Sequence, residues 1–388
     1  MNGGIRKWIG RGALALALAG AATCAAWKVA AARRPPCPGA HWTTKAPEAA
    51  GFSSAKLQAF ADRAGGAGCL VQGGEMIFTW GDVAFRGDVA SSCKPIYAFL
   101  TFKAIELGLI GSLDEPILRW APEIGDLNAE LGYKDRAITF RHLLNQTSGY
   151  GLAEKPGEAF AYNDFATGLL VWTLFYRVYG KLPVQYDELL NGEWLGQWLK
   201  FEDQPTANYQ NASYPNQHRG RIRMSARDMA RFALLYLRGG EWNGRRLLRQ
   251  DLFEQAMDGT LPLAFPRTSG REAEDLSAQG WKPIGGGKNE KNHLGCLGYF
   301  WWHNETTPDG ARFLPDAPPR TFMGSGYGGR FAMVIVPELD LVAVWQNVHE
   351  DEDWSPLSEI GRFKVNEMLR ELLAARTTES APALFRMK

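Results

Sequence analysis

The stretch Asp88-Val89-Ala90-Ser91-Ser92-Cys93-Lys94 decides how this sequence is interpreted. It follows a strand-rich segment and opens an apolar stretch, residues 94–109, that has the pattern of a buried helix. Ser91 and Lys94 are three residues apart and therefore share one face of that helix. A serine beside an amine can act as an activated nucleophile, and the free N–H groups of a helix start stabilise an oxyanion. The stretch therefore predicts a nucleophile where a strand-rich segment meets a helix.

The spacing of a serine and a lysine alone does not identify a nucleophile. Ser53 and Lys56 have the same spacing at the start of a short amphipathic helix, residues 54–64, where a capping serine explains the pattern fully. Taken alone, Ser91 is also explained as a helix cap. Whether Ser91 is a nucleophile or a helix cap has to be judged from the rest of the chain.

The two ends of the chain carry strand pairs. Residues 69–72 and 76–80 are joined by Gly73-Gly74, a turn signal, and residues 331–336 and 341–347 form a second antiparallel pair. Pro356 starts a final amphipathic helix after Ser355. Helical patterns dominate between these pairs: residues 140–145, residues 165–179, and a helix that begins at Ser225 with Asp228 at capping-box spacing.

These patterns predict an α/β (α+β) fold, with an antiparallel sheet flanked by terminal helices and a mostly helical inserted domain. The expected sheet domain is discontinuous, with residues 41–95 and 315–376, and residues 96–314 form the insertion. Residues 1–40 are expected to be a leader with a proline-rich linker, and residues 377–388 a C-terminal tail.

The composition is that of a folded globular protein. The chain has 388 residues, of which 45% are hydrophobic, and its 43 Lys and Arg nearly cancel 42 Asp and Glu. A net charge of +1 argues against a nucleic-acid partner, because such binding needs a strongly basic surface.

The cysteines do not predict a metal centre. The five are Cys24, Cys37, Cys69, Cys93 and Cys296, with no Cys-x-x-Cys pair, and no His-Glu-x-x-His sequence occurs. We expect no cofactor. A disulfide among the last four stays open, but buried free thiols are favoured.

The N-terminus is typical of an export signal. Arg6, Lys7 and Arg11 precede an uncharged run, residues 12–27, that is shorter than a membrane span needs. We expect export to the periplasm or another extracytoplasmic space, with the leader either cleaved or retained as a membrane anchor. A disordered cytosolic tail is the alternative.

Five further segments follow the Ser91 stretch in order: residues 111–116 (GSLDEP), 138–149 (ITFRHLLNQTSG), 156–164 (PGEAFAYND), 224–231 (MSARDMAR) and 326–330 (GYGGR). Together with residues 88–94, these segments resemble the serine β-lactamase and penicillin-binding-protein superfamily, in particular its class C, DD-peptidase and esterase branch. The resemblance covers roughly residues 45–375 and implies a β-lactamase/transpeptidase-like fold.

The resemblance implies acyl transfer through a serine ester. Ser91 would attack the carbonyl, and Lys94 and Tyr162 would share the proton transfers. The N–H groups of Ser91 and Arg330 would form the oxyanion hole. Gly329 lies beside Arg330 in the segment 326–330, which takes the place of the third catalytic motif of the family. These roles are carried over from the family.

Two positions depart from the family pattern. Asp164 stands where the family has Asn, so that an acceptor replaces an amide donor; it equally fits the N-cap of the helix that starts at Phe165. Tyr327 stands where Lys or His is usual, which removes a cation that helps to hold a substrate carboxylate. Arg330 is hypothesised to restore that charge.

Other conspicuous residues are interpreted as structural. His142 has no second histidine nearby and is expected to be packed. Residues 298–302 are interpreted as an aromatic strand near the cleft wall, and residues 219–223 as a solvated basic loop. The absence of Gly-x-Ser-x-Gly argues against an α/β-hydrolase.

The sequence therefore predicts an exported serine hydrolase that acts on a carboxylic ester or amide of a small-molecule or peptidoglycan-derived substrate. A DD-carboxypeptidase or β-lactamase acting on peptidoglycan-type amides is one alternative. A catalytically silent envelope binding protein on the same fold is the other.

Overall fold

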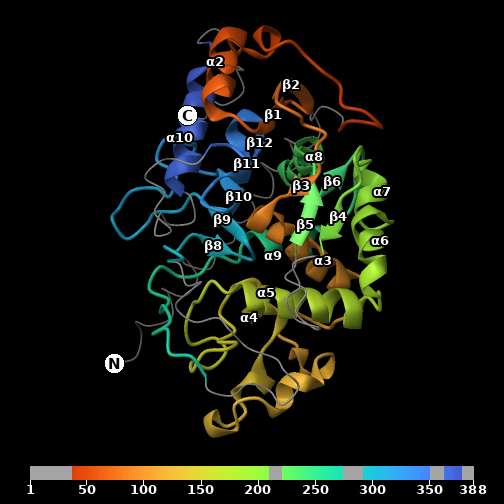
Figure 1. Cartoon of the computed structure of the whole chain (residues 1–388), viewed down its shortest axis with the longest axis vertical. Coiled ribbons are helices and arrows are strands. Elements are labelled where there is room, and N and C mark those ends of the chain that lie inside the picture. The colour runs from red at the N-terminus through yellow and green to blue at the C-terminus, as the bar shows by residue number, and fades with distance from the viewer. Residues whose placement is uncertain (1–36, 209–220, 274–291, 350–361, 378–388) are drawn as a thin grey trace, which may run out of the picture. The chain divides into compact units, whose positions relative to one another are not determined.

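A seven-stranded antiparallel sheet organises the protein in the computed structural model, which describes residues 37–208, 221–273, 292–349 and 362–377 (Figure 1). The strand order is β2-β1-β12-β11-β10-β9-β8. The strands of this sheet are β1 Ala67–Gln72, β2 Glu75–Trp80, β8 Leu297–Gly298, β9 Trp301–His303, β10 Phe322–Gly326, β11 Phe331–Val336 and β12 Leu341–Gln346. The antiparallel sheet of the prediction is confirmed.

Helices occupy much of the remaining described chain. They are α2 Ser54–Ala64, α3 Lys94–Glu106, α4 Phe140–Leu144, α5 Asp164–Val171, α6 Tyr186–Asn191, α7 Gly196–Leu199, α8 Ala226–Leu237, α9 Gln250–Met257 and α10 Arg362–Ala374. Two smaller sheets pair β3 Gly87–Asp88 and β4 Thr206–Asn208 with the central β5 Arg221–Met224, and β6 Glu241–Trp242 with β7 Arg245–Arg246.

Each face of the large sheet is covered by helices. Ala332 and Val334 of β11 belong to the same apolar cluster as buried residues of α2 and α10. Met333 and Ile335 of β11 belong to a second cluster, which contains the buried side chains of α3 and α8. Because successive side chains of a strand point to opposite faces, a strand buried on both sides must be apolar throughout, as β11 is.

The strongly patterned elements form where the sequence predicts them. Helix α2 has the expected bounds, and the Ser53 side chain accepts a hydrogen bond from the Lys56 N–H (3.4 Å). Gly73 and Gly74 join β1 to β2 with φ of 62° and 84°, which glycine adopts without a steric penalty. Helix α3 begins at Lys94 after a 3₁₀ turn, Ala90–Cys93.

Residues 298–302 do not form one continuous strand. Tyr299 and Phe300 have φ of 46° and 69° and form the tight turn between β8 and β9. The Tyr299 N–H donates to the Asn145 Oδ1 (2.8 Å), which anchors this turn to the end of α4. Two strands of the large sheet therefore precede residue 315, where the sequence placed the start of the second half of the sheet domain.

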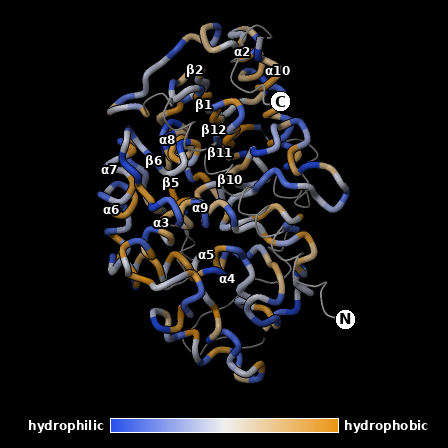
Figure 2. The backbone as a smooth tube through the Cα atoms, turned by 180° about the vertical axis from the view of Figure 1, so that it is seen from behind, coloured by the Kyte–Doolittle hydropathy of each residue, from blue (hydrophilic) through white to orange (hydrophobic). Residues whose placement is uncertain are grey.

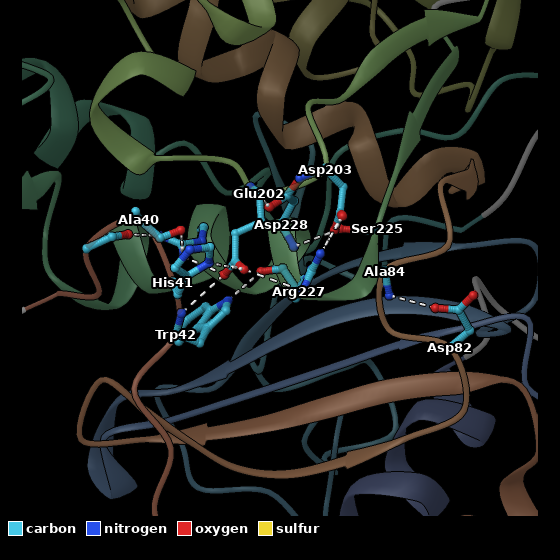
Figure 3. Close-up of polar contacts among 12 residues, drawn as sticks. Ala40, His41, Trp42, Asp82, Ala84, Glu202, Asp203, Ser225, Arg227 and Asp228 are labelled. Atoms are coloured by element: carbon cyan, nitrogen blue, oxygen red, sulfur yellow. Dashed lines mark hydrogen bonds and ion pairs between the residues drawn. The ribbon is translucent and has the colours of Figure 1, made fainter.

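Helix α8 has half of the expected capping box. The Ser225 Oγ accepts from the Asp228 N–H (3.2 Å), but the Asp228 carboxylate accepts from the N–H groups of Glu202 and Asp203 (2.8 and 2.9 Å; Figure 3). The buried Arg231 donates to Glu202 and to the carbonyl of Gly39. The start of the described chain is thereby tied to α8.

Hydrophobic and hydrophilic residues are interspersed along the described chain (Figure 2). Within these residues, no helix is both long and apolar enough to cross a membrane. The predicted leader, with Cys24, lies outside the described residues, as do the start of the last helix at Ser355 and residues 378–388. The four cysteines that are described are buried free thiols, and burial raises the pKa of Cys69 to about 12.

Candidate active site

Ser91 lies in the 3₁₀ turn Ala90–Cys93 that leads into α3. The turn is tightly held, since the Ser92 N–H and Oγ both donate to the Val89 carbonyl (3.3 and 2.5 Å). Ser91 is partly exposed, whereas Ser92 and Cys93 are buried. Lys94 follows as the first residue of α3, and its Nζ donates to the Ser91 Oγ (3.2 Å). Spacing on one helical face therefore brings the predicted nucleophile and amine together.

Lys94 is the centre of the site. Its Nζ lies 2.6 Å from the Tyr162 Oη and 2.6 Å from the Asp164 Oδ1, and 3.9 Å from the centre of the Tyr162 ring. The Lys94 side chain is only 5% exposed. Burial alone would lower the pKa of Lys94, but the charge of Asp164 and the Tyr162 oxygen outweigh it, so that this pKa is raised above its ordinary value. Lys94 is therefore an ammonium at neutral pH.

Asn163, not Asp164, caps helix α5. Its Oδ1 accepts from the N–H groups of Phe165 and Ala166 (2.9 and 3.2 Å), and its Nδ2 donates to the Tyr150 carbonyl (2.8 Å). Asp164 is the first residue of the helix and turns its carboxylate to Lys94. The N-cap alternative for Asp164 is wrong, because a residue already inside the first turn cannot accept the cap's hydrogen bonds.

Strand β10 passes beside the Ser91 turn. A Cβ atom on Gly326 would lie 2.7 Å from the Ser91 backbone nitrogen, and one on Gly324 would lie 3.0 Å from the Ser92 carbonyl oxygen. Only glycine permits so close an approach of two backbones. The sequence singled out Gly326 only as the first residue of the segment 326–330 and did not single out Gly324, although two glycines inside one strand signal a close backbone contact.

The predicted third-motif residues lie one step beyond this contact, in the turn between β10 and β11. Tyr327 has a φ of 46° and is 53% exposed, and Gly329 is buried with its carbonyl accepting from the Trp345 indole (2.8 Å). The Arg330 N–H donates to the Tyr327 carbonyl (3.2 Å). That N–H is used within its own turn, and the role of Arg330 in an oxyanion hole stays a prediction.

The Arg330 side chain extends to the end of β12. Its Nε donates to the Val348 carbonyl (3.1 Å), its Nη2 donates to the Asn347 side chain, and its guanidinium carbon lies 5.5 Å from the centre of the Tyr327 ring. The structure therefore places Tyr327 and Arg330 together.

His142 and Arg221 have structural contacts. The His142 Nδ1 accepts from the Thr139 N–H (3.2 Å) and completes a capping box for α4, so the packed interpretation is confirmed. Arg221 does not belong to a solvated loop, because its Nε donates to the Asp88 carboxylate (2.9 Å) within the sheet of β3, β5 and β4. In the described residues, no group of three or more His, Cys, Asp or Glu side chains is arranged to hold a metal ion.

Known structures share this architecture. A penicillin-binding-protein homologue from Caulobacter crescentus aligns over 88% of this chain and 98% of its own, with 15% identity and a TM-score of 0.56. A β-lactamase from Mycobacterium bovis aligns over 82% and 99%, with 18% identity and a TM-score of 0.53. EstCE1, a hydrolase with promiscuous acyltransferase activity, aligns over 82% and 98%, with 13% identity and a TM-score of 0.50. At these identities the likeness shows the fold.

A comparison with curated proteins found no match. The family model described as Beta-lactamase matches residues 54–347, which is most of the chain and includes Ser91, Lys94, Tyr162 and β10. The protein therefore belongs to the β-lactamase family, within the serine β-lactamase and penicillin-binding-protein-like superfamily.

Proposed function

We propose that the protein hydrolyses a carboxylic ester or amide through an acyl-enzyme on Ser91. The observation that carries the proposal is that one buried ammonium, Lys94, contacts the Ser91 Oγ, the Tyr162 Oη and the Asp164 carboxylate at once. A hydroxyl is a weak nucleophile until a base accepts its proton, and this cluster can relay that proton without a metal or cofactor.

The proposed reaction has two balanced halves. The Ser91 Oγ bonds to the acyl carbon while its proton passes to the Lys94–Tyr162 pair, taken in the form that lacks one proton. The oxyanion that results accepts a hydrogen bond from the Ser91 N–H, and the backbone of β10 lies alongside. Collapse of this intermediate then expels an alcohol or amine, which takes the proton from the pair. Water then attacks the ester carbon and loses a proton to the same pair. The C–O bond to the Ser91 Oγ breaks, the acid leaves, and the pair returns that proton to the Ser91 Oγ.

Neutral esters suit the site better than anionic β-lactams or peptide carboxylates. Asp164 adds a negative charge beside the nucleophile, and its side chain is 45% exposed. The Tyr327 phenol supplies no cation in the turn beyond β10. A carboxylate on the substrate would therefore meet repulsion from Asp164.

The β-lactamase or DD-carboxypeptidase alternative is supported by the family and by the penicillin-binding-protein homologue of the same fold. The silent-protein alternative is supported by Asp164, which holds Lys94 in its protonated form. These alternatives differ in which reagent, if any, acylates Ser91.

Purified protein should be treated with a fluorophosphonate probe, a p-nitrophenyl ester and a fluorescent penicillin. Ser53→Ala is the matched control for Ser91→Ala, because Ser53 has the same spacing to a lysine but only caps α2. We expect ester turnover and fluorophosphonate labelling that Ser91→Ala abolishes and Ser53→Ala leaves intact. Labelling by penicillin with negligible ester turnover would favour the peptidase or β-lactamase alternative. No Ser91-dependent labelling by any reagent would favour the silent protein.

Export, with the N-terminal segment cleaved or kept as an anchor, is a further proposal supported by the charge pattern of residues 1–34. Fractionation of cells that produce the full chain, followed by N-terminal sequencing, tests it. Recovery of uncleaved protein in the cytosolic fraction would contradict it.

A further inference from the structure

Asp88 makes two contacts immediately before the nucleophile. Its Oδ1 accepts from the Ala90 N–H (2.9 Å), and its Oδ2 accepts from the Arg221 Nε (2.9 Å). The two side chains are only 25% and 31% exposed. One carboxylate therefore joins the residue next to Ser91 to a strand that lies more than a hundred residues further along the chain.

Ala90 has a conformation that needs such support. Its φ is +51°, in the left-handed region that costs a non-glycine residue about 1–2 kcal/mol. On the other side of the turn, a Cβ on Gly326 would come within 2.9 Å of the Ala90 Cβ and 2.7 Å of the Ser91 nitrogen. The strained turn is thus confined between β10 and the Asp88 carboxylate, and a shift of Ala90 would move both the Ser91 N–H and the Ser91 Oγ.

Strand β5 pairs with β3, the strand that contains Asp88. Asp88 pairs with Arg223 and Gly87 with Met224 in the small sheet, and the Val89 N–H donates to the Ile222 carbonyl (3.1 Å). The chain that enters the Ser91 turn is therefore held by backbone bonds up to Val89. From there, Asp88 supplies the described contact to the Ala90 N–H.

The Asp88–Arg221 ion pair belongs to the electrostatic environment of the site. Burial would lower the pKa of Arg221, but the Asp88 charge outweighs it and raises that pKa, and Asp164 acts in the same direction. An ion pair at this depth is costly to break from one side, because the remaining partner keeps its desolvation penalty. The ion pair therefore favours a fixed position of the Asp88 carboxylate.

We propose that Asp88 and Arg221 are positioning residues that hold the strained Ala90 turn and so aim the Ser91 Oγ and N–H at the substrate carbonyl. The inference rests on the proposed function, in which Ser91 is the nucleophile. Neither residue touches the reacting atoms. Their removal should slow acylation while substrate binding is largely kept.

The test compares Asp88→Ala with a control that has the same local geometry. Asp82 accepts from the Ala84 N–H (3.1 Å) with the same two-residue spacing, in an exposed turn upstream (Figure 3). Pre-steady-state hydrolysis of a p-nitrophenyl ester separates the acylation rate from KM. We expect Asp88→Ala to lower the acylation rate by about 10- to 100-fold with KM within about threefold, and Asp82→Ala to stay within about twofold of wild type.

Conservative variants separate positioning from simple loss of structure. Asp88→Asn keeps an oxygen for the Ala90 N–H and loses the charge, so it should recover part of the acylation rate lost in Asp88→Ala. Arg221→Gln should resemble Asp88→Asn. Wild-type acylation rates in Asp88→Asn and Arg221→Gln would overturn the proposal, even if Asp88→Ala fails to fold.

Amide hydrogen exchange at Ala90 tests the positioning role without relying on enzyme activity. In wild type this amide should exchange slowly because Asp88 accepts its hydrogen bond, and Asp88→Asn should raise the rate without a matching rise at Ala84. An Ala90 amide that exchanges rapidly in wild type would overturn the positioning role. Absence of Ser91 labelling in wild type would instead overturn the proposed function.

Discussion

Replacing Asp164 by asparagine should lower the pKa of Lys94 and shift the pH dependence of ester hydrolysis. The substitution removes one charge with little other change, because asparagine keeps an oxygen that can accept from the Lys94 Nζ. Helix α5 should keep its cap, since Asn163 provides it. Asp164 and Tyr162 together raise the pKa of Lys94 against the effect of burial, so loss of the carboxylate leaves burial to lower it.

The separation of the charges sets the magnitude. Across the 2.6 Å between the Lys94 Nζ and the Asp164 Oδ1, two unit charges attract by about 6 kcal/mol at an effective dielectric constant of about 20, and by about 1.6 kcal/mol in bulk water. Loss of this attraction lowers the pKa of Lys94. The Asp164 side chain is 45% exposed and therefore well screened, which favours the lower of these two energies.

The measurement is kcat/KM for a neutral p-nitrophenyl ester between about pH 6 and pH 10. The active form of the Lys94–Tyr162 pair lacks one proton, so activity should rise with pH, and its apparent pKa belongs to the pair. A lower pKa moves this rise to lower pH. At neutral pH, a fall of one unit makes the active form about tenfold more abundant.

Asp251→Asn is the control, because it removes a carboxylate from an exposed ion pair with Arg249. Its profile should coincide with that of wild type. An Asp164→Asn profile that stays within about 0.3 units of wild type, or that moves to higher pH, would refute the assigned role of Asp164.

Three further changes test other parts of the structure. Gly326→Ala places a methyl group 2.7 Å from the Ser91 nitrogen and should slow fluorophosphonate labelling by about 100-fold or more; normal labelling would show that the turn can yield. Asn163→Ala removes the α5 cap and should cost about 1–2 kcal/mol in urea unfolding, with slower labelling because Tyr162 loses its support. Burial lowers the pKa of His303 to about 4. As pH falls below about 6.5, the His303 imidazole therefore becomes protonated in the unfolded chain before it does so in the folded protein. By about pH 4.5 the free energy of unfolding of wild type should fall by about 2 kcal/mol relative to that of His303→Gln. A difference between the two proteins that does not depend on pH would contradict this expectation.

The sequence predicts β1, β2, β11 and β12 of the large sheet, because each of these strands has six residues. Strands β11 and β12 are buried on both faces and appear as continuous hydrophobic runs, and the turn glycines mark the first hairpin. The small sheet of β3, β5 and β4 was not predicted, since strands of two to four residues carry no usable periodicity. Its formation depends on contacts between distant segments, and these contacts support the Ser91 turn.

Each residue of the candidate catalytic cluster lies in a recognisable local pattern, and the cluster was predictable to that extent. Ser91 and Lys94 share one helical face, and Tyr162 comes from a segment that resembles the second family motif. The role of Asp164 was open, because an acidic residue at a helix start fits both a cap and a lysine partner. The structure decides between them through the preceding residue, since Asn163 accepts both N–H groups that a cap would accept.

The segment 326–330 shows why motif order alone does not place a backbone donor. The sequence assigned the oxyanion N–H to Arg330 from its place after the motif, but that N–H closes the turn onto Tyr327. The strand before the turn approaches Ser91, and it can do so because Gly324 and Gly326 have no side chains. A strand interrupted by glycine loses stability, so two glycines one and three residues before a hairpin turn indicate that the backbone itself is needed there. The Ser91 turn is therefore confined on two sides, by the glycines of β10 and by the Asp88 carboxylate.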